Sequence, residues 1–333
     1  MMICNDFDLH PPLYRTAMSA MSVITPPVNI FAIYCIIKKS TSQMGPYKWL
    51  LLAYQITSAT FDSLLTIIIL PVMFFPIAMG YADSTIARWL SLSTNAAVIM
   101  IVTTVPILTV CIVVLFLYRC HLVIPHYHFL KMNKKGQTFV PTAVLFIICG
   151  PVVASLAHLS PDQSEARQWA LAEYSCAKSA IDAPRLHIYT ADSVRPLSIS
   201  GASVGVTAAA ISLFAILLSF YFLGEANHLS RKTRLMQRRF LIYLCIQASV
   251  PTFSLLGPML IILIKKSAVG QEGGNLIFFF MAFHGLTSPL SVVFCNDAYR
   301  SYALAPLKLK CANTIQNPIA TVSELSVRRS SAR

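Results

Sequence analysis

Seven long apolar runs constrain what this chain can fold into more than any other feature. Each run has 22 to 30 residues, which is enough for a helix to cross a hydrocarbon core of about 30 Å. Backbone groups inside a bilayer must bond to one another, and runs this long and apolar are unsuited to barrel strands. The sequence therefore predicts an all-α, polytopic bundle of seven membrane-spanning helices. The predicted spans are residues 13–37, 47–73, 89–118, 138–159, 199–223, 237–264 and 274–295.

The basic residues gather on alternate connections between these runs. Of the 26 Lys and Arg residues, 18 lie in or beside segments 38–46, 119–137, 224–239 and 296–333, whereas 8 lie on the opposite side together with most of the acids. The positive-inside rule then places the N-terminus outside and the C-terminus inside. Membrane topology thus accounts for the net charge of +13 better than nucleic-acid binding does.

The two ends of the chain differ from the seven runs between them. The first residues carry acids and no basic region, so no cleavable signal peptide is expected and the first run serves as its own insertion signal. We expect one seven-helix domain over 1–310, which includes a short amphipathic helix over 296–310. A disordered cytoplasmic tail is expected over 311–333.

Asp62 is the only acid inside a predicted span. Burying a carboxylate costs several kcal/mol unless it is neutral or paired. Asp62 is therefore either a cation or proton site in the bundle core or a hydrogen-bonded group that joins helices. Its expected polar neighbours are Asn29, Asn95, His284 and Ser288. Asn95, His284 and Ser288 are also the ligand-binding candidates, although His284 equally suits an internal polar network.

The sixth run has a cationic foot that passes without a loop into a hydrophobic segment. Its basic residues are Arg231, Lys232, Arg234, Arg238 and Arg239. Pro251 and Pro258 interrupt the apolar part, and a proline removes a backbone hydrogen bond and permits a kink. We expect this helix to swing at its basic end about these hinges. Pro289 is expected to kink the seventh helix in the same way.

Arg119 and two cysteines complete the candidate residues. Arg119 ends the third predicted span on the basic side, where it either locks and releases the foot of the bundle or anchors the helix to the membrane surface. Cys4 and Cys176 are the only cysteines predicted to lie outside, and an oxidising exterior would let them form a disulfide. No metal site or cofactor is expected.

Several motifs spread over nearly the whole chain point to one family. The most specific is the run Ser230, Lys232, Thr233, Gln237, Gln247, Pro251 and Pro258. Weaker ones are Pro46-Tyr47-Lys48-Trp49, Glu173-Tyr174-Ser175-Cys176, His284-Gly285-Leu286-Thr287-Ser288 and Tyr299-Arg300. Together they resemble the nematode serpentine chemoreceptors of class H (Srh) in the Str superfamily. The chain departs from the family pattern at Leu117-Tyr118, before Arg119, and at Ala298.

The resemblance implies a G-protein-coupled receptor with no enzymatic activity. It would lie in the plasma membrane of sensory cilia, bind a small odorant or pheromone between the outer halves of the helices, and activate a heterotrimeric G protein. Membrane lipids are expected at the basic loops. The residues expected to face the G protein are Arg119, Ser230, Lys232, Thr233, Arg238, Arg239, Tyr299 and Arg300.

The sequence bears on three functions other than that of a receptor. A small-solute transporter or channel remains the alternative, although Asp62 is the only acid available to line a path. A retinal-based light receptor needs a lysine in the seventh span, and residues 274–295 contain none. An intramembrane hydrolase needs a metal cluster or paired carboxylates in the bilayer, whereas Asp62 is the only carboxylate in the predicted spans.

Overall fold

The computed structural model describes residues 7–225, 230–257, 261 and 270–305. Within these residues, six helices are long and apolar enough to cross a membrane, which confirms a polytopic helical bundle. They are α1 (Pro12–Lys39), α2 (Tyr47–Ser63) with its π-helical continuation η2 (Leu64–Ile69), α4 (Thr94–Val123), α5 (Lys134–Leu156), α7 (Ala191–Glu225) and α10 (Gln271–Phe294).

A further helix, α8 (Arg231–Pro251), contains the start of the predicted sixth span but begins six residues before it. It continues as a π-helical turn, η4 (Thr252–Leu256), and most of the rest of that predicted span lies outside the described residues. Ser230 caps α8, because its Oγ accepts a hydrogen bond from the Thr233 amide at 3.2 Å. The Ser-x-x-Thr part of the sequence motif therefore starts this helix.

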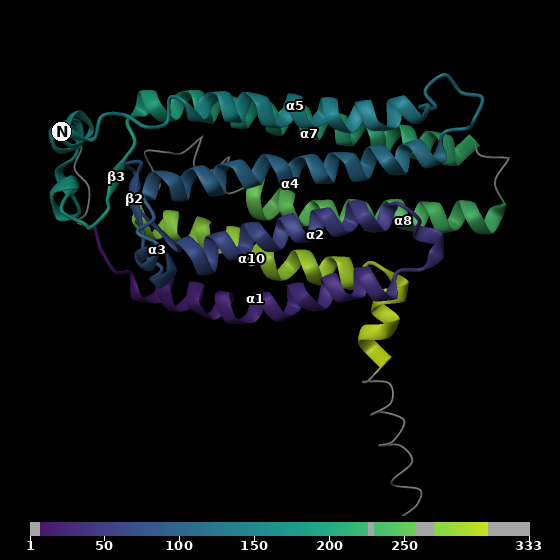
Figure 1. The fold of residues 1–333 in the computed structure, drawn as a ribbon, viewed down its shortest axis with the longest axis horizontal. Coiled ribbons are helices and arrows are strands. Elements are labelled where there is room, and N and C mark those ends of the chain that lie inside the picture. The colour runs from purple at the N-terminus through teal and green to yellow at the C-terminus, as the bar shows by residue number, and fades with distance from the viewer. Residues whose placement is uncertain (1–6, 226–229, 258–260, 262–269, 306–333) are drawn as a thin grey trace, which may run out of the picture.

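The helices run side by side along the long axis of the molecule (Figure 1). α1 packs against α2 and α10, and α4 packs against α2, α5 and α7. α8 contacts α10, α7 and α4. A second, smaller core lies where α4, α5 and α7 meet, and it contains Val113, Ile148 and Val204. α4 thus connects the two parts of the bundle.

A small antiparallel sheet closes one end of the bundle, at the left of Figure 1. It has the order β1 (Pro71–Met73), β2 (Met79–Ala82), β3 (His187–Ile188), with Met73 opposite Gly80 and Gly80 opposite His187. A Cβ on Gly80 would overlap the Val72 carbonyl, so only glycine fits there. We call residues 71–89 and 157–190 the cap, and the opposite end of the bundle the basic end.

Short helices fill the rest of the cap. They are α3 (Thr85–Trp89), α6 (Gln163–Glu173) and the 3-10 turn η3 (Ser175–Ser179). A second 3-10 turn, η1 (Ser42–Met44), lies at the basic end between α1 and α2.

Besides the sixth, three predicted spans end or begin in the wrong place, and the fifth of the seven begins at Ala191 rather than at residue 199. The second does not continue to residue 73, because Leu70 turns out of the helix with φ 49° and Pro71 starts β1. The third does not begin at residue 89, since Trp89 ends α3 and α4 starts five residues later, where the Ser93 Oγ accepts a bond from the Ala96 amide. α4 then continues to Val123, beyond the predicted end at residue 118.

Residues 297–305 form a helix that turns away from the bundle at the basic end (Figure 1). It packs on α1, because the Lys39 ammonium lies 4.1 Å from the Tyr302 ring centroid and the Phe31 ring stacks on Tyr302 at 6.4 Å. The remainder of the predicted helix over 296–310, and the predicted tail, lie outside the described residues.

Candidate functional site

Asp62 lies at the centre of a buried polar cluster formed by α1, α2 and α10. Its side chain is 2% exposed. The Thr25 hydroxyl of α1 donates a hydrogen bond to Oδ2 at 2.5 Å, and Gly285 of α10 lies directly against the carboxylate. The absence of a side chain at Gly285 allows this close approach, since a Cβ there would overlap the Asp62 carboxylate.

Hydrogen bonds extend this cluster along α2 towards the basic end. Asn29 donates to the Gly285 carbonyl at 3.1 Å and accepts from the Gln55 amide at 2.7 Å. The Tyr54 hydroxyl lies 2.9 Å from the Ser288 Oγ. The cluster therefore joins three helices, as expected for buried polar side chains that hold membrane helices together.

His284 is buried completely within α10, beside the same cluster. Its ring packs edge-on against Phe61 with centroids 6.2 Å apart. Both ring nitrogens of His284, Oδ1 of Asp62 and Oε1 of Gln55 make no hydrogen bond to any described residue. Unsatisfied buried polar atoms are costly. The cluster can therefore serve as helix contact and as a place for a proton, a cation or a water.

Asn95 is the ligand-binding candidate that the structure separates from the others. It lies at the start of α4 beside the cap, where its amide donates to the Ser160 hydroxyl at 3.2 Å and accepts from the Tyr189 hydroxyl at 3.5 Å. The prediction that Asn95 neighbours Asp62 is wrong, because the chain enters α4 later than expected. His284 and Ser288 do lie with Asp62.

Arg119 is buried at the basic end, with 7% of its side chain exposed. Its guanidinium carbon lies 3.7 Å from the centroid of the Tyr47 ring of α2 and 4.7 Å from that of the Phe240 ring of α8. Nε makes no hydrogen bond to the described residues. We call Tyr47, Arg119 and Phe240 the aromatic clamp. It joins α2, α4 and α8 through cation–π contacts.

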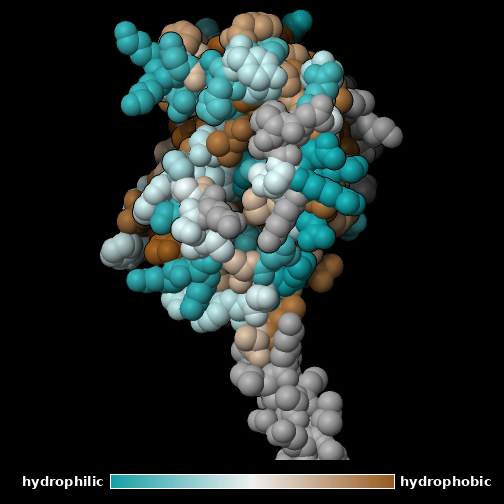
Figure 2. All heavy atoms as spheres, turned by 90° about the vertical axis from the view of Figure 1, so that its right-hand side faces the viewer, coloured by the Kyte–Doolittle hydropathy of each residue, from teal (hydrophilic) through white to brown (hydrophobic). Residues whose placement is uncertain are grey.

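The other residues predicted to face a partner divide into two groups. Arg238 and Arg239 are exposed on the foot of α8, and hydrophilic side chains gather over this end of the molecule (Figure 2). Arg300 is half-exposed and paired with Asp297 at 2.5 Å. Tyr299, in contrast, is completely buried, and its hydroxyl lies 2.6 Å from the Ser40 Oγ. The prediction that Tyr299 offers a contact surface is therefore wrong for this conformation.

Three predictions concern prolines. Pro251 is buried at the end of α8, and the π-helical turn η4 follows it directly. Such turns often mark functional positions in helices. Pro289 is buried within α10. Pro258 lies outside the described residues.

The predicted disulfide falls partly outside the described residues. Cys176 is buried in η3 of the cap and takes part in a disulfide. Cys4 lies outside the described residues, so its pairing with Cys176 stays a prediction.

The cap holds the first described residues against the bundle. The Tyr81 hydroxyl donates to the Leu9 carbonyl at 2.5 Å, and Arg15 pairs with Asp83 at 2.8 Å. The Gln271 side chain exchanges two hydrogen bonds with the backbone of Asp8, at 2.8 and 2.5 Å. The cap, α1 and α10 are therefore tied together at this end.

We expect His187 in β3 to make the cap sensitive to acid. Burial beside Tyr189 and Gln163 lowers its pKa below the usual value near 6.5. His187 would accept a proton more readily when the cap is unfolded than when it is folded. The folded cap should therefore lose stability as the pH falls below about 6.5. We expect amide protection over residues 160–190 to fall a few-fold between pH 7.5 and 5.5. Hydrogen exchange corrected for intrinsic rates measures this, and His187→Gln should abolish the effect while His158→Gln should preserve it.

Sequence reasoning missed most partners of the predicted residues. Tyr54, Ser58 and Asp62 recur every four residues in an apolar run, and this spacing places them on one helix face. That signal could have identified the polar face of α2. Nothing in the sequence pairs Tyr47 or Phe240 with Arg119, because the contacts join helices far apart in the chain.

Comparison with known proteins agrees with the fold. Residues 10–309 match the model of the family described as serpentine type 7TM GPCR chemoreceptor Srh. The crystal structure of squid rhodopsin is similar, with a TM-score of 0.54 and 12% sequence identity over 92% of this chain and 89% of that chain. At this identity the likeness concerns the fold, a seven-helix receptor bundle, and nothing more. No curated protein matches the sequence.

Proposed function

This chain belongs to the Srh family of serpentine seven-transmembrane chemoreceptors, which are G-protein-coupled receptors. From that premise we propose that it binds a small, largely apolar cue towards its capped end and activates a heterotrimeric G protein at its basic end. The excess of Lys and Arg favours a cytoplasmic position for the basic end. Placement in sensory cilia is part of the same proposal.

The aromatic clamp is the observation that carries this proposal. Arg119 is covered by Phe240 of α8, so a partner can reach it only when the foot of α8 moves away. That movement would uncover Arg119 next to the exposed Arg238 and Arg239, and so form a basic cleft. In this proposal, the arrangement with Phe240 against Arg119 is the closed position of the foot. A cue acts by favouring the open arrangement over this one.

Nucleotide exchange on a purified G protein tests the proposal. Membranes that contain the chain are assayed with and without a panel of volatile and pheromone-like compounds. Exchange that depends on both a compound and the receptor supports the proposal. Uptake of labelled compound into proteoliposomes, without exchange on any G protein tested, would instead favour a transporter.

Replacing Pro251 with alanine is expected to reduce compound-stimulated exchange several-fold without changing surface expression. Alanine supplies the amide that proline lacks, and straightening of α8 should stabilise its closed position. Pro141→Ala in α5 makes the same chemical change in a helix that need not move. If both variants signal like the wild type, Pro251 is not a hinge.

A further inference from the structure

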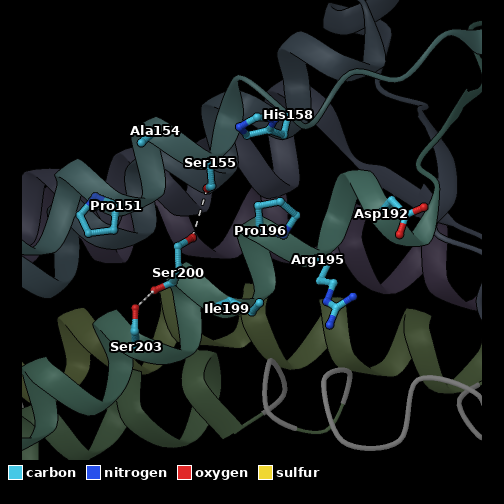
Figure 3. A pocket seen from close by; sticks show the side chains of 10 residues that line it. All are labelled: Pro151, Ala154, Ser155, His158, Asp192, Arg195, Pro196, Ile199, Ser200 and Ser203. Atoms are coloured by element: carbon cyan, nitrogen blue, oxygen red, sulfur yellow. Dashed lines mark hydrogen bonds between the residues drawn. The ribbon is translucent and has the colours of Figure 1, made fainter.

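A groove on the outside of the bundle lies between α5 and α7, close to the cap (Figure 3). Its volume is about 590 Å³, within the range of pockets that hold small ligands. Its lining residues are Pro151, Ala154, Ser155, His158, Asp192, Arg195, Pro196, Ile199, Ser200 and Ser203. None of these residues was among the candidates from the sequence.

Polarity changes along this groove in one direction. Asp192 and Arg195 lie at the end of α7 nearest the cap, and His158 lies in the cap just after α5; all three side chains are exposed. Pro151, Ile199 and Ser203 lie further along the same helices, away from the cap. A charged mouth therefore leads to a mainly apolar channel.

The floor of the groove is closed by a hydrogen bond between its two helices. The Ser200 hydroxyl donates to the Ser155 Oγ at 3.1 Å, and both residues are buried (Figure 3). Ser155 itself donates to the Val152 carbonyl at 2.7 Å. A ligand can therefore lie along the groove, whereas it cannot pass between the helices without breaking this bond.

Arg195 provides charge complementarity at the mouth. It forms no ion pair with any described acid, including Asp192 three residues earlier. The two side chains point in different directions in Figure 3. The guanidinium is therefore available to bind a carboxylate or a similar anion through paired hydrogen bonds.

The cap covers the end of the bundle, which favours entry of a ligand from the side, between α5 and α7. Thr94 donates to the Arg185 carbonyl at 2.7 Å, and Arg185 donates to the Ala87 carbonyl at 3.0 Å, so the long connection before α7 is tied across the start of α4. An apolar molecule concentrates in the bilayer, and the groove between α5 and α7 opens on the outer face of these two spanning helices. Such a molecule reaches the groove without crossing the cap.

We propose that this groove binds a single-chain amphiphile with an anionic head group, which enters from the bilayer and places its head at Arg195 and its chain along Ile199 and Pro151. This inference deepens the proposed function and rests on it for its meaning as a cue site. α5 and α7 both pack on α4, the helix that carries Arg119. Occupancy of the groove thus acts on the helix that the aromatic clamp holds.

Binding of a fluorescent dodecanoate to the purified receptor in detergent tests the inference. We expect Arg195→Ala to weaken binding about tenfold, the loss typical of one charge-assisted hydrogen-bonded contact. Ile199→Trp, which fills the channel, should abolish it. Asp192→Asn should leave binding unchanged or strengthen it, since it removes a negative charge that would repel the anionic head group at the mouth. Ile199 and Arg195 are exposed, so these variants should fold.

Three results would overturn the inference. Equal competition by dodecanol and dodecanoate would remove the role of the charged head. Loss of binding in Asp192→Asn but not in Arg195→Ala would indicate a cationic ligand. Displacement of the probe by phosphatidylglycerol at concentrations where unlabelled dodecanoate has no effect would make the groove a site for membrane lipid. Compound-dependent nucleotide exchange that survives Ile199→Trp would overturn the groove as the cue site while the proposed function stood.

Discussion

Replacing Phe240 with alanine should raise exchange in the absence of any cue about tenfold. The substitution removes the ring that covers Arg119 from the α8 side, 4.7 Å from the guanidinium carbon. A partly desolvated cation–π contact contributes about 0.5–2 kcal/mol, and 1.4 kcal/mol changes an equilibrium constant tenfold. Basal exchange is proportional to the fraction of receptors with an open foot. While this fraction is small, it rises in proportion to the equilibrium constant for opening, so a tenfold change in the constant gives nearly a tenfold change in exchange. Nucleotide exchange, normalised to surface receptor, measures it.

Matched variants separate the clamp from general damage to α8. Phe253→Ala makes the same change in η4, where the ring is 79% exposed, and should leave basal exchange unchanged. Phe240→Trp keeps an aromatic face and should keep basal exchange low. Arg119→Lys keeps the charge but loses the planar stacking, so an intermediate effect is expected. Wild-type basal exchange in Phe240→Ala would show that the clamp does not hold the foot closed.

Replacing Gly285 with alanine should destabilise the receptor by overpacking the contact between α10 and α2. The added Cβ would overlap the Asp62 carboxylate, so α10 and α2 must separate or the carboxylate must leave Thr25. Overpacking of this kind costs about 1–3 kcal/mol. For a chain of this size we expect the melting temperature to fall by about 1–4 °C. Thermal unfolding of the detergent-purified receptor gives the value.

The structure offers a control and a rescue for Gly285→Ala. Gly150→Ala adds the same methyl group within α5, where nothing lies within 4 Å of the new Cβ, and should be neutral or slightly stabilising. Asp62→Ala in the Gly285→Ala background removes the group that the methyl meets, so the two losses should be less than additive. Strict additivity would contradict the close contact between Asp62 and Gly285.

The sequence predicted the bundle well because each span is encoded locally. A run of apolar residues needs no information from the rest of the chain to form a helix in a bilayer. The start of α5 was predicted within four residues, whereas α7 begins eight residues before the predicted start of the fifth span. The cap was missed because its strands have only two to four residues each, and because β2 pairs with β3 across the four helices α3 to α6. No periodicity can emerge from so short a strand.

The candidate site was predicted in part for the same reason. Asp62, His284 and Arg119 stand out because a charged or polar group in an apolar run is rare. Their partners do not stand out, since Phe240 and Gly285 look like ordinary residues of a membrane helix. Asn95 was placed wrongly because its position depended on where α4 begins, and the turn at Leu70 and the short α3 before it were not visible in the pattern.

The cap sheet has a consequence for how the receptor is made. β1 and β2 are synthesised together, before α4, but β3 follows only after α4 and α5. One edge of β2 therefore remains unpaired while the ribosome synthesises α4 and α5. An unpaired strand edge can pair with strands of other chains. The sheet can close only when these helices have brought residues 187–188 back to the same side of the bilayer. The complete cap sheet can therefore form only in receptors in which α4 and α5 have been inserted with the correct topology.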